Sequence, residues 1–356
     1  MYARGYAFLD RLRVVYTKAA VIHSSGMTII QPFSFVFILV LFAVAYQMPA
    51  FNLAAFAAVL YLIQKIFVYL QSTQSALHTI ADLTPFAANV SVFKQSLLDN
   101  TETVSHDDIP FHFETALSFE AVSASYPTRP SALSGISFSI PKGSLVGMIG
   151  PSGGGKTSVA DVILRLLAPT EGVVTLDGKS IDRFSIDEWR RAVAYVSQDI
   201  FLMDASVSDN IRFYDDSLSD EAVREAAQKA QIFDVVEKLP EGFATVIGER
   251  GVTLSVGQRQ RIVLARALVR KPEIMVLDEA TSALDSESEM AIKEVIESMR
   301  GKVTLIVIAH RMATVRDADS IIVIKDGKVA EQGTPGDMLR RQDSYFGHMQ
   351  RLQGSL

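Results

Sequence analysis

A glycine-rich segment near the middle of the chain places the strongest constraint on its fold. Residues 150–157 read GPSGGGKT, which matches G-x-x-x-x-G-K-[ST] in full. A short apolar run, residues 145–149, precedes the segment, and a mostly apolar stretch, residues 158–167, follows it. A strand before the motif and a helix after it distinguish a phosphate-binding P-loop from a chance match. The segment therefore predicts an α/β domain with a nucleotide site.

The P-loop pattern assigns roles to individual residues. Glycines let backbone N–H groups close around phosphate oxygens, and the helix N-terminus adds its partial positive charge. Lys156 is expected to reach the β- and γ-phosphates of ATP, and Thr157 to ligate Mg²⁺. The other candidate phosphate contacts in this segment are Gly150, Ser152, Gly153, Gly154, Gly155 and Ser158.

A second motif, which contains two acidic residues, lies about 120 residues further on. The apolar run at residues 274–277 ends in Asp278 and Glu279. Asp278 is suited to a second Mg²⁺ contact, and Glu279 to polarising an attacking water. Taken alone, the pair would more simply be two solvated acids at the tip of a strand. A P-loop in the same domain favours the catalytic interpretation.

The segment TLSVGQRQR, residues 253–261, resembles the LSGGQ signature of ABC ATPases and precedes the two acids at that family's spacing. The resemblance extends from about Ala116 to the end of the chain. One position departs from it: Val256 stands where the family has a second glycine. A β-branched residue would be costly there if the backbone needed a positive φ, but Ser255 and Gly257 remain, and we interpret Val256 as tolerated.

The resemblance implies roles for four further residues. Tyr126 matches the aromatic that stacks on adenine, and Gln198 matches the Q-loop glutamine that senses the γ-phosphate and Mg²⁺. Asp285 matches the D-loop aspartate, and His310 matches the switch histidine. Taken singly, Tyr126, Gln198 and His310 would be ordinary, namely a sheet-edge tyrosine, a loop glutamine and a satisfied histidine. Their order along the chain supports the family assignment.

In this family the signature of one subunit closes over the P-loop of another. The resemblance therefore implies a second ABC subunit, in a homodimer or a heterodimer. Ser255, Gly257 and Gln258 would contact ATP held by the partner. The implied Mg²⁺ ligands are Thr157, Gln198 and Asp278, and the implied catalytic residues are Glu279, His310 and Gln198.

The N-terminal part of the chain is apolar and almost free of charged residues over a long stretch. Residues 19–64 contain no Asp, Glu, Lys or Arg. Within and just beyond this window, residues 27–46 and 53–70 form two apolar stretches near the ~20 residues that a bilayer-spanning helix needs. A buried pair of core helices is the alternative. A signal peptide is excluded, because the stretch is too long and lies too far into the chain.

The flanking charges predict the orientation of the two spans. Four basic residues precede the first span, and the connection at residues 47–52 carries no charge. By the positive-inside rule both ends of the hairpin lie in the cytoplasm. Lys65, inside the second span, is expected to snorkel toward the interface, with a polar pathway as the alternative. We expect an integral protein of the plasma (bacterial inner) membrane with a cytoplasmic ATPase domain.

These patterns divide the chain into three parts. Residues 1–98 form an all-α transmembrane hairpin with a helix continuing to about residue 98, residues 99–110 an acidic linker, and residues 111–356 an ABC-type nucleotide-binding domain. The expected fold class is thus an α/β P-loop NTPase domain, with a largely parallel sheet, behind a helical hairpin. Asp-Gly pairs at 177–178 and 326–327 predict hairpin turns.

Composition narrows the choice of partners. The net charge of −6 argues against nucleic acid as the main partner. The absence of cysteine excludes disulfides and thiolate metal sites. A membrane segment fused in front of the ATPase resembles ABC exporters rather than importers, and residues 248–251 resemble an exporter coupling element. The two helices resemble the last two of the six in an exporter subunit, so either the chain is a fragment or a partner supplies the missing helices.

The sequence therefore predicts an ATP-binding and ATP-hydrolysing subunit of an ABC exporter or lipid flippase, with ATP, Mg²⁺ and membrane lipid as its ligands and surroundings. Two alternatives stay open. One is a soluble-type ABC ATPase of DNA repair or translation, and the other is a truncated product that binds ATP but transports nothing.

Overall fold

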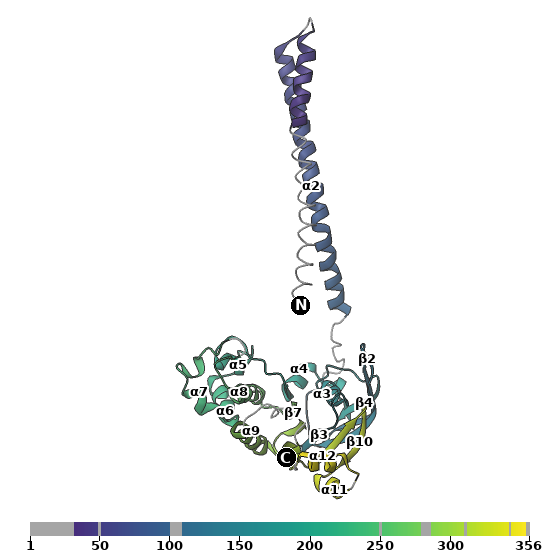
Figure 1. Ribbon diagram of the computed structural model, residues 1–356, viewed down its shortest axis with the longest axis vertical. Helices are drawn as coiled ribbons and strands as arrows, with labels where there is room; N and C mark the ends of the chain where they lie inside the picture. The colour runs from purple at the N-terminus through teal and green to yellow at the C-terminus, as the bar shows by residue number, and fades with distance from the viewer. Residues whose placement is uncertain are drawn as a thin grey trace. The chain divides into compact units, whose positions relative to one another are not determined.

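The computed structural model describes residues 32–48, 51–99, 109–248, 251–278, 286–309, 312–341 and 343–353. The chain divides into two compact units, Met1–Glu102 and Thr103–Leu356. Figure 1 labels the elements of both units.

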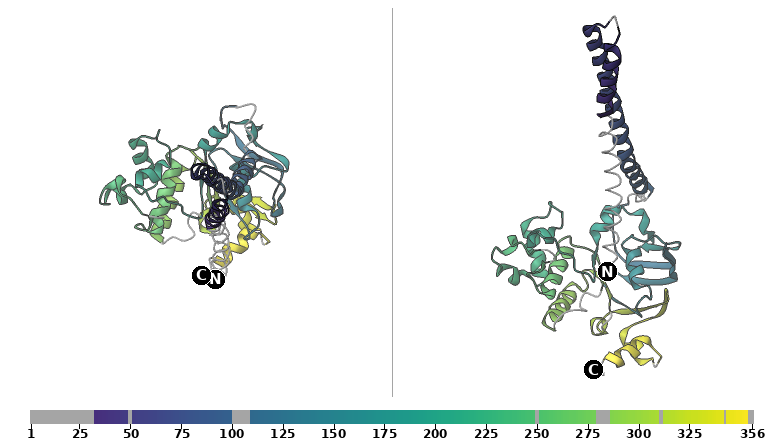
Figure 2. Two further views of the ribbon diagram at one scale, coloured as in Figure 1. Left: turned by 90° about the horizontal axis from the view of Figure 1, so that it is seen from above. Right: turned by 45° about the horizontal axis from the view of Figure 1, so that its top comes forward.

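The first unit contains two described helices that lie side by side next to their connecting turn (Figure 2). They are Pro32–Tyr46 and α2, Leu53–Asp99. The side chain of Asn52 accepts hydrogen bonds from the backbone N–H groups of Ala54 and Ala55, at 2.9 and 3.2 Å. Asparagine is a favoured N-cap, which explains why α2 begins directly after it.

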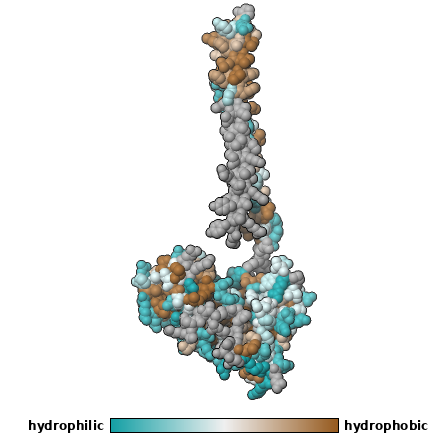
Figure 3. Space-filling model, in the orientation of Figure 1, coloured by the Kyte–Doolittle hydropathy of each residue, from teal (hydrophilic) through white to brown (hydrophobic). Residues whose placement is uncertain are grey.

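Apolar side chains gather over this helical pair (Figure 3). None of the residues of α2 is buried, and among the described residues α2 is the one helix long and apolar enough to cross a membrane. The predicted span at 53–70 is thus the first part of a 47-residue helix. Pro32–Tyr46 is a shorter apolar helix. Residues 27–31 of the predicted first span lie outside the described residues.

A six-stranded sheet forms the centre of the second unit. Neighbouring strands are parallel from β9 through β3, β8 and β7 to β6, and β10 is antiparallel to β9. Every residue of β3, β7 and β8 is buried, as expected for parallel strands covered on both faces. In spatial order the strands are β10 (Lys328–Gly333), β9 (Ser320–Lys325), β3 (Leu145–Ile149), β8 (Thr304–Ile308), β7 (Ile274–Asp278) and β6 (Val193–Val196).

A separate antiparallel sheet lies beside the first, which the sequence did not predict. Its strands, in spatial order, are β2 (Arg129–Pro141), β1 (Ala116–Tyr126), β4 (Glu171–Leu176) and β5 (Lys179–Ser180). The α/β fold class is confirmed, and the six-stranded sheet is largely parallel as expected; the antiparallel sheet is an additional element. Apolar runs in the sequence indicate strands without indicating which sheet they join.

Both predicted hairpin turns are confirmed. Asp177 and Gly178 connect β4 to β5, and Asp326 and Gly327 connect β9 to β10. All four residues have positive φ, between 51° and 77°. Asp-Gly pairs favour the tight hairpin turns that need this conformation at both central residues.

Helices cover the six-stranded sheet and form a group of their own. In Figures 1 and 2, α5, α6, α7 and α8 gather on one side of this unit, away from the antiparallel sheet. The helices of the unit are α3 (Lys156–Ile163), α4 (Ile186–Ala192), α5 (Val207–Arg212), α6 (Asp220–Lys229), α7 (Phe233–Glu237), α8 (Val256–Leu268), α9 (Ser286–Met299), α10 (Met312–Val315), α11 (Pro335–Arg340) and α12 (Tyr345–Gln353).

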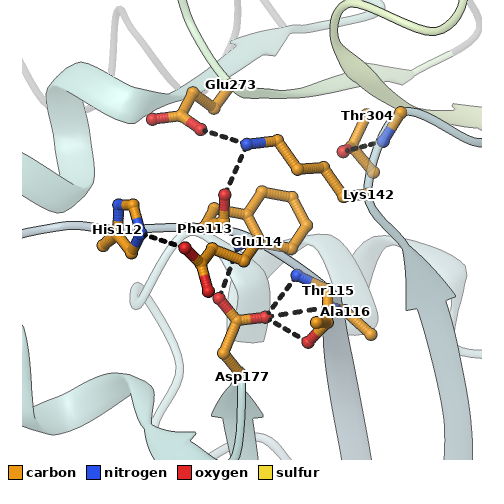
Figure 4. A network of polar contacts seen from close by, with 10 residues as sticks. His112, Phe113, Glu114, Thr115, Ala116, Lys142, Asp177, Glu273 and Thr304 are labelled. Carbon is orange, nitrogen blue, oxygen red and sulfur yellow. Dashed lines mark hydrogen bonds and ion pairs between the residues drawn. The ribbon is translucent and has the colours of Figure 1, made fainter.

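Polar contacts join the two sheets (Figure 4). Lys142, just past β2, donates to the carbonyl of Phe113 and forms an ion pair of 3.3 Å with Glu273, which precedes β7. The next backbone N–H, of Gly143, donates to the hydroxyl of Thr304 on β8 at 2.9 Å. The end of β2 is therefore fixed against the amino ends of the central strands.

Asp177 anchors the start of β1 in the same network. Its carboxylate accepts bonds from the N–H groups of Glu114, Thr115 and Ala116 and from the hydroxyl of Thr115. Partial burial alone would raise its pKa, but these donors together lower the pKa to about 2. The hairpin turn predicted from Asp177 and Gly178 thus also holds the segment that leads into the domain.

Candidate nucleotide site

The strand ends that carry the predicted motifs meet at one edge of the six-stranded sheet. Ile308 of β8 is the register partner of both Met148 on β3 and Asp278 on β7. All three strands are parallel, so their carboxyl ends share an edge, which is where open α/β sheets bind ligands. The P-loop after β3 and Asp278 at the end of β7 are thus brought together.

The P-loop backbone packs closely against strand β9. Gly150 has a φ of 146°, and a Cβ atom there would lie 2.0 Å from the carbonyl oxygen of Ile324. At Gly154 a Cβ atom would lie 2.7 Å from the same oxygen. The Gly154 carbonyl in turn accepts a 2.8 Å bond from the N–H of Gly327. Only glycine fits these two positions, and the resulting cradle is the kind of backbone surface that binds phosphate.

Lys156 begins α3 inside this cradle. The residue is 6% exposed, and its ammonium group donates to the carbonyls of Gly150 and Pro151 at 2.9 and 3.0 Å. Gly155 precedes the helix with a φ of 115° and has no side chain to cap it. The first N–H groups of a helix lack intrahelical partners, so this end of α3 combines backbone donors with a buried cation. That combination suits the phosphates of a nucleotide.

The helix after the P-loop is shifted from its predicted position. The sequence indicated residues 158–167, whereas α3 spans Lys156–Ile163. The helix starts earlier because Lys156 and Thr157 already belong to its first turn. It ends earlier because Arg165 takes a left-handed φ of 56°, which terminates an α-helix.

Arg129 is a site residue that the sequence analysis missed. Its guanidinium donates to the carbonyl of Gly153 in the P-loop at 2.5 Å. The residue begins β2 and pairs across the strand with Tyr126. No motif marked it, and only the sheet pairing brings residues 126–129 over the P-loop.

Tyr126 ends β1, and its hydroxyl donates to the carboxylate of Asp161 on α3. Partial burial and the bond to this carboxylate raise the pKa of Tyr126, so the phenol remains neutral at physiological pH. The ring thus lies beside the helix that follows the P-loop. Ser158, also on α3, is buried. Stacking of Tyr126 on adenine stays a prediction.

The proposed Mg²⁺ ligands come from three elements. Asp278 is 7% exposed at the end of β7, and its Oδ2 accepts a 3.1 Å bond from the hydroxyl of Tyr195. Thr157 on α3 and Gln198 just after β6 are exposed. Hydroxyl, carboxylate and amide oxygens suit Mg²⁺, which is often bound through one or two carboxylates together with substrate phosphates. The described residues contain no cluster of three or more His, Cys, Asp or Glu arranged for a metal, and this mode of binding needs none.

The signature segment forms the start of α8. Ser255 is its N-cap, accepting a 3.2 Å bond from the N–H of Gln258, while the Gln258 side chain accepts a 2.9 Å bond from the N–H of Ser255. This reciprocal pair is a capping box. Val256 is the first helical residue and so has an ordinary negative φ. Its branched side chain therefore causes no strain, and the doubt about this position is removed.

Residues 133–282 match the family model described as ABC transporter. The chain contains a domain of the ABC transporter family. Its domain is an ATP-binding, ATP-hydrolysing ABC domain, and the predicted family is confirmed.

Relatives of this ABC chain agree with an exporter-type subunit. It is 44% identical to the mitochondrial potassium channel ATP-binding subunit of Rattus norvegicus, over 65% of the chain and 33% of that protein. It is 42% identical to the heterocyst differentiation ATP-binding protein HepA of Nostoc sp., over 67% and 40%. The chain thus spans about a third of the length of these curated relatives.

A solved structure extends the similarity to the helical unit. The structure of a bacterial Atm1-family ABC exporter with ATP bound matches 99% of this chain and 60% of its own, with a TM-score of 0.79 and 29% identity. The exporter-type assignment therefore rests on both units, since the match includes the helices as well as the ABC domain.

Three predicted residues lie outside the described residues of this ABC domain, namely Glu279, Asp285 and His310. Residues 249–250 of the predicted coupling element do so as well. Glu279 directly follows the last residue of β7, and His310 follows Ala309, just past β8. Their catalytic roles stay predictions.

Proposed function

We propose that this chain is one half of an ABC exporter, which uses ATP hydrolysis to move a lipid-like substrate across the plasma membrane. The observation that carries this proposal is the similarity of 99% of the chain, helices included, to an ATP-bound exporter. The apolar helix α2 and the ABC domain on one chain support it.

Within one subunit, we propose that ATP is held at the sheet edge described above. Lys156 binds the β- and γ-phosphates inside the cradle, and backbone N–H groups of residues 152–155 surround them. Mg²⁺, held by Thr157, Asp278 and Gln198, neutralises phosphate charge. The ring of Tyr126 stacks on adenine.

The second half of the site comes from the partner subunit. The capping box of α8 uses the N–H groups of Ser255 and Gln258, which leaves those of Val256 and Gly257 outside it. A helix N-terminus with available N–H groups attracts anions. The hydroxyl of Ser255 accepts one bond in the cap and keeps its hydrogen for donation. We propose that this end of α8 contacts the γ-phosphate of ATP bound to the partner, with Asp285 at the same interface.

Hydrolysis then opens the dimer. Glu279 accepts the proton of the attacking water, while His310 and Gln198 contact the γ-phosphate. Loss of that phosphate removes the contact between the subunits, and the membrane helices convert closing and opening into alternating access. A complete pathway would need transmembrane helices in addition to Pro32–Tyr46 and α2.

The test compares two glutamate variants of the full chain. In Glu279→Gln the amide cannot accept a proton, so ATP binding should persist while hydrolysis falls by about 10²–10⁴-fold. Glu273→Gln, six residues earlier on the other end of β7, changes only the ion pair with Lys142 and should keep normal turnover. Retention of more than about a tenth of the activity by Glu279→Gln would contradict the assigned base.

Transport is tested separately in vesicles. ATP-dependent movement of a fluorescent phospholipid analogue between leaflets, absent in the Glu279→Gln variant, would support the flippase. Hydrolysis without such movement, in vesicles that also contain the additional transmembrane helices, would refute the lipid-like substrate and leave an ATPase whose cargo is of another kind.

A further inference from the structure

Strand β6 contributes an aromatic side chain to the nucleotide site that none of the motifs includes. β6 is one of the two edge strands of the six-stranded sheet and is parallel to β7, and Tyr195 on β6 is the register partner of Val276. Side chains of a strand alternate between the two faces of the sheet. Tyr195 therefore lies on the same face as Val276 and, two residues further along β7, Asp278.

The tyrosine reaches the carboxylate at the end of the neighbouring strand. Its hydroxyl donates to Oδ2 of Asp278 at 3.1 Å. Tyr195 is partly buried and packs against the apolar core on this side of the sheet, so its ring has little freedom to move. Burial raises the pKa of Tyr195, and the negative charge of Asp278 raises it further. The phenol therefore stays protonated and can donate its hydrogen.

We propose that Tyr195 is a positioning residue for the Mg²⁺-binding carboxylate. With Oδ2 held by the phenol, the carboxylate of Asp278 is fixed in rotation. Gln198 follows two residues after the end of the same strand, so the bond also links the two strands whose ends carry proposed Mg²⁺ ligands. This inference rests on the proposed function, in which Asp278 binds the Mg²⁺ that accompanies ATP.

A purely structural role is the competing explanation. A buried carboxylate needs hydrogen-bond donors wherever it lies, and a bond made only for that reason would affect folding stability. It would leave the Mg²⁺ requirement unchanged. A residue that orients a metal ligand, by contrast, changes metal affinity, typically by 10–100-fold on mutation.

The experiment uses Tyr195→Phe in the purified full chain. This change removes the hydroxyl and keeps the ring that packs in the core. Binding of a fluorescent ATP analogue is titrated against free Mg²⁺ and repeated in EDTA. We expect the half-saturating Mg²⁺ concentration to rise by about 10–100-fold, while affinity for the nucleotide in EDTA changes less than about twofold. Tyr214→Phe, in a side chain that is 83% exposed, is the matched control and should change neither quantity.

The outcomes separate this inference from the function on which it rests. Normal Mg²⁺-dependent binding by the unmodified chain, with an unchanged Mg²⁺ requirement in Tyr195→Phe, would overturn the positioning role alone. That holds even if the variant melts at a lower temperature, since a structural bond predicts that result. Absence of Mg²⁺-dependent binding in the unmodified chain would overturn both the proposed site and this role.

Discussion

Two helix N-termini in the ABC domain carry the proposed phosphate contacts, and they are built in opposite ways. At α3 the helix is preceded by Gly155 in the left-handed region, with no side-chain cap, and Lys156, the first helical residue, is buried. At α8 the helix is closed by the capping box of Ser255 and Gln258. The first is an open cradle held by its neighbours in the sheet, and the second is a self-contained helix start exposed at the surface.

This difference indicates which part of ATP binding each helix N-terminus performs. The cradle at α3 depends on tertiary contacts, because Gly150 and Gly154 pack against the carbonyl of Ile324. It can be formed and ready in a single subunit. The end of α8 satisfies part of its own backbone, and Ser255 and Val256 are exposed there, which suits a ligand that arrives bound to another subunit. The comparison predicts that ATP binds at α3 of one subunit and that α8 of the partner subunit completes the site.

The largest effects should come from disabling each terminus separately. Lys156→Ala removes the cation of the cradle and Ser255→Arg blocks the surface of α8, so each variant alone should lose more than about 99% of its ATPase activity, within the range for removing catalytic groups. Mixed together, the two variants should recover part of that activity. Some mixed dimers pair an intact cradle with an intact α8, and hydrolysis is measured at high protein concentration.

Controls for the mixing experiment are mixtures of each variant with itself, which should show no recovery. Strong hydrolysis by the Ser255→Arg variant alone would show that α8 does not touch the nucleotide, and the comparison between the two termini would fail.

A smaller change tests the role of α8 in nucleotide binding while the N-cap of the helix is kept. Asp caps helices about as well as Ser, so Ser255→Asp should leave the melting temperature unchanged. Its negative charge faces the γ-phosphate, and loss of one charge-assisted bond, about 1.5–3 kcal/mol, predicts a decrease in ATPase activity of about 10–150-fold. Ser219→Asp makes the same exchange at the N-cap of α6 and should leave the ATPase rate unchanged. Equal rates in the two variants would assign Ser255 a capping role only.

The third prediction concerns the base-binding side of the α3 cradle. Tyr126→Ala should weaken ATP binding by about 1–3 kcal/mol, the range for stacking of a base on an aromatic ring. Tyr126→Phe keeps the ring and removes the bond to Asp161, so most of the affinity should remain. Isothermal titration distinguishes these cases. A larger loss in the Phe variant than in the Ala variant would show that the hydroxyl, rather than the ring, binds the nucleotide.

The smallest effect is expected away from both termini, at Asp177. Asp177→Asn keeps a residue that tolerates the left-handed turn but weakens the four bonds that the carboxylate accepts. We expect a loss of about 1 kcal/mol at pH 7, or about 2–4 °C in the melting temperature of the ABC domain, with unchanged ATP binding. Changed ATP binding would show that this anchor influences the nucleotide site.

The acid dependence of this loss follows from the lowered pKa. Because the folded-state pKa of Asp177 is about 2, its stabilisation is present above the ordinary carboxylate pKa of about 4. The contribution decreases as the pH falls from there through about 2. The difference between Asp177→Asn and the unmodified chain should therefore shrink over this interval. Asp326→Asn, in the other Asp-Gly hairpin, is the matched control. A difference that stays constant down to pH 2 would contradict the charge-based explanation.

The extent of sequence prediction can be judged from particular residues. The P-loop, the strand that ends at Asp278 and both Asp-Gly hairpins were predicted correctly, because each depends on a short, local pattern. The helix after the P-loop was misplaced at both ends, since its termination depends on a left-handed Arg165 that no motif marks. Arg129 and Tyr195 were missed because their contacts join residues 24 and 83 positions apart in the chain.

The sequence by itself determined the main local features of this protein: its family, its glycine-rich loop, its acidic strand end and its long apolar helical segment. Those features are encoded in residue types at fixed local spacing. Only the tertiary structure decided that β1 and β4 form a second sheet, that Arg129 and Tyr195 join the site, and that Val256 is a helical residue without strain. Strand partners, sheet order and long-range hydrogen bonds depend on the packing of distant segments, which local spacing does not specify.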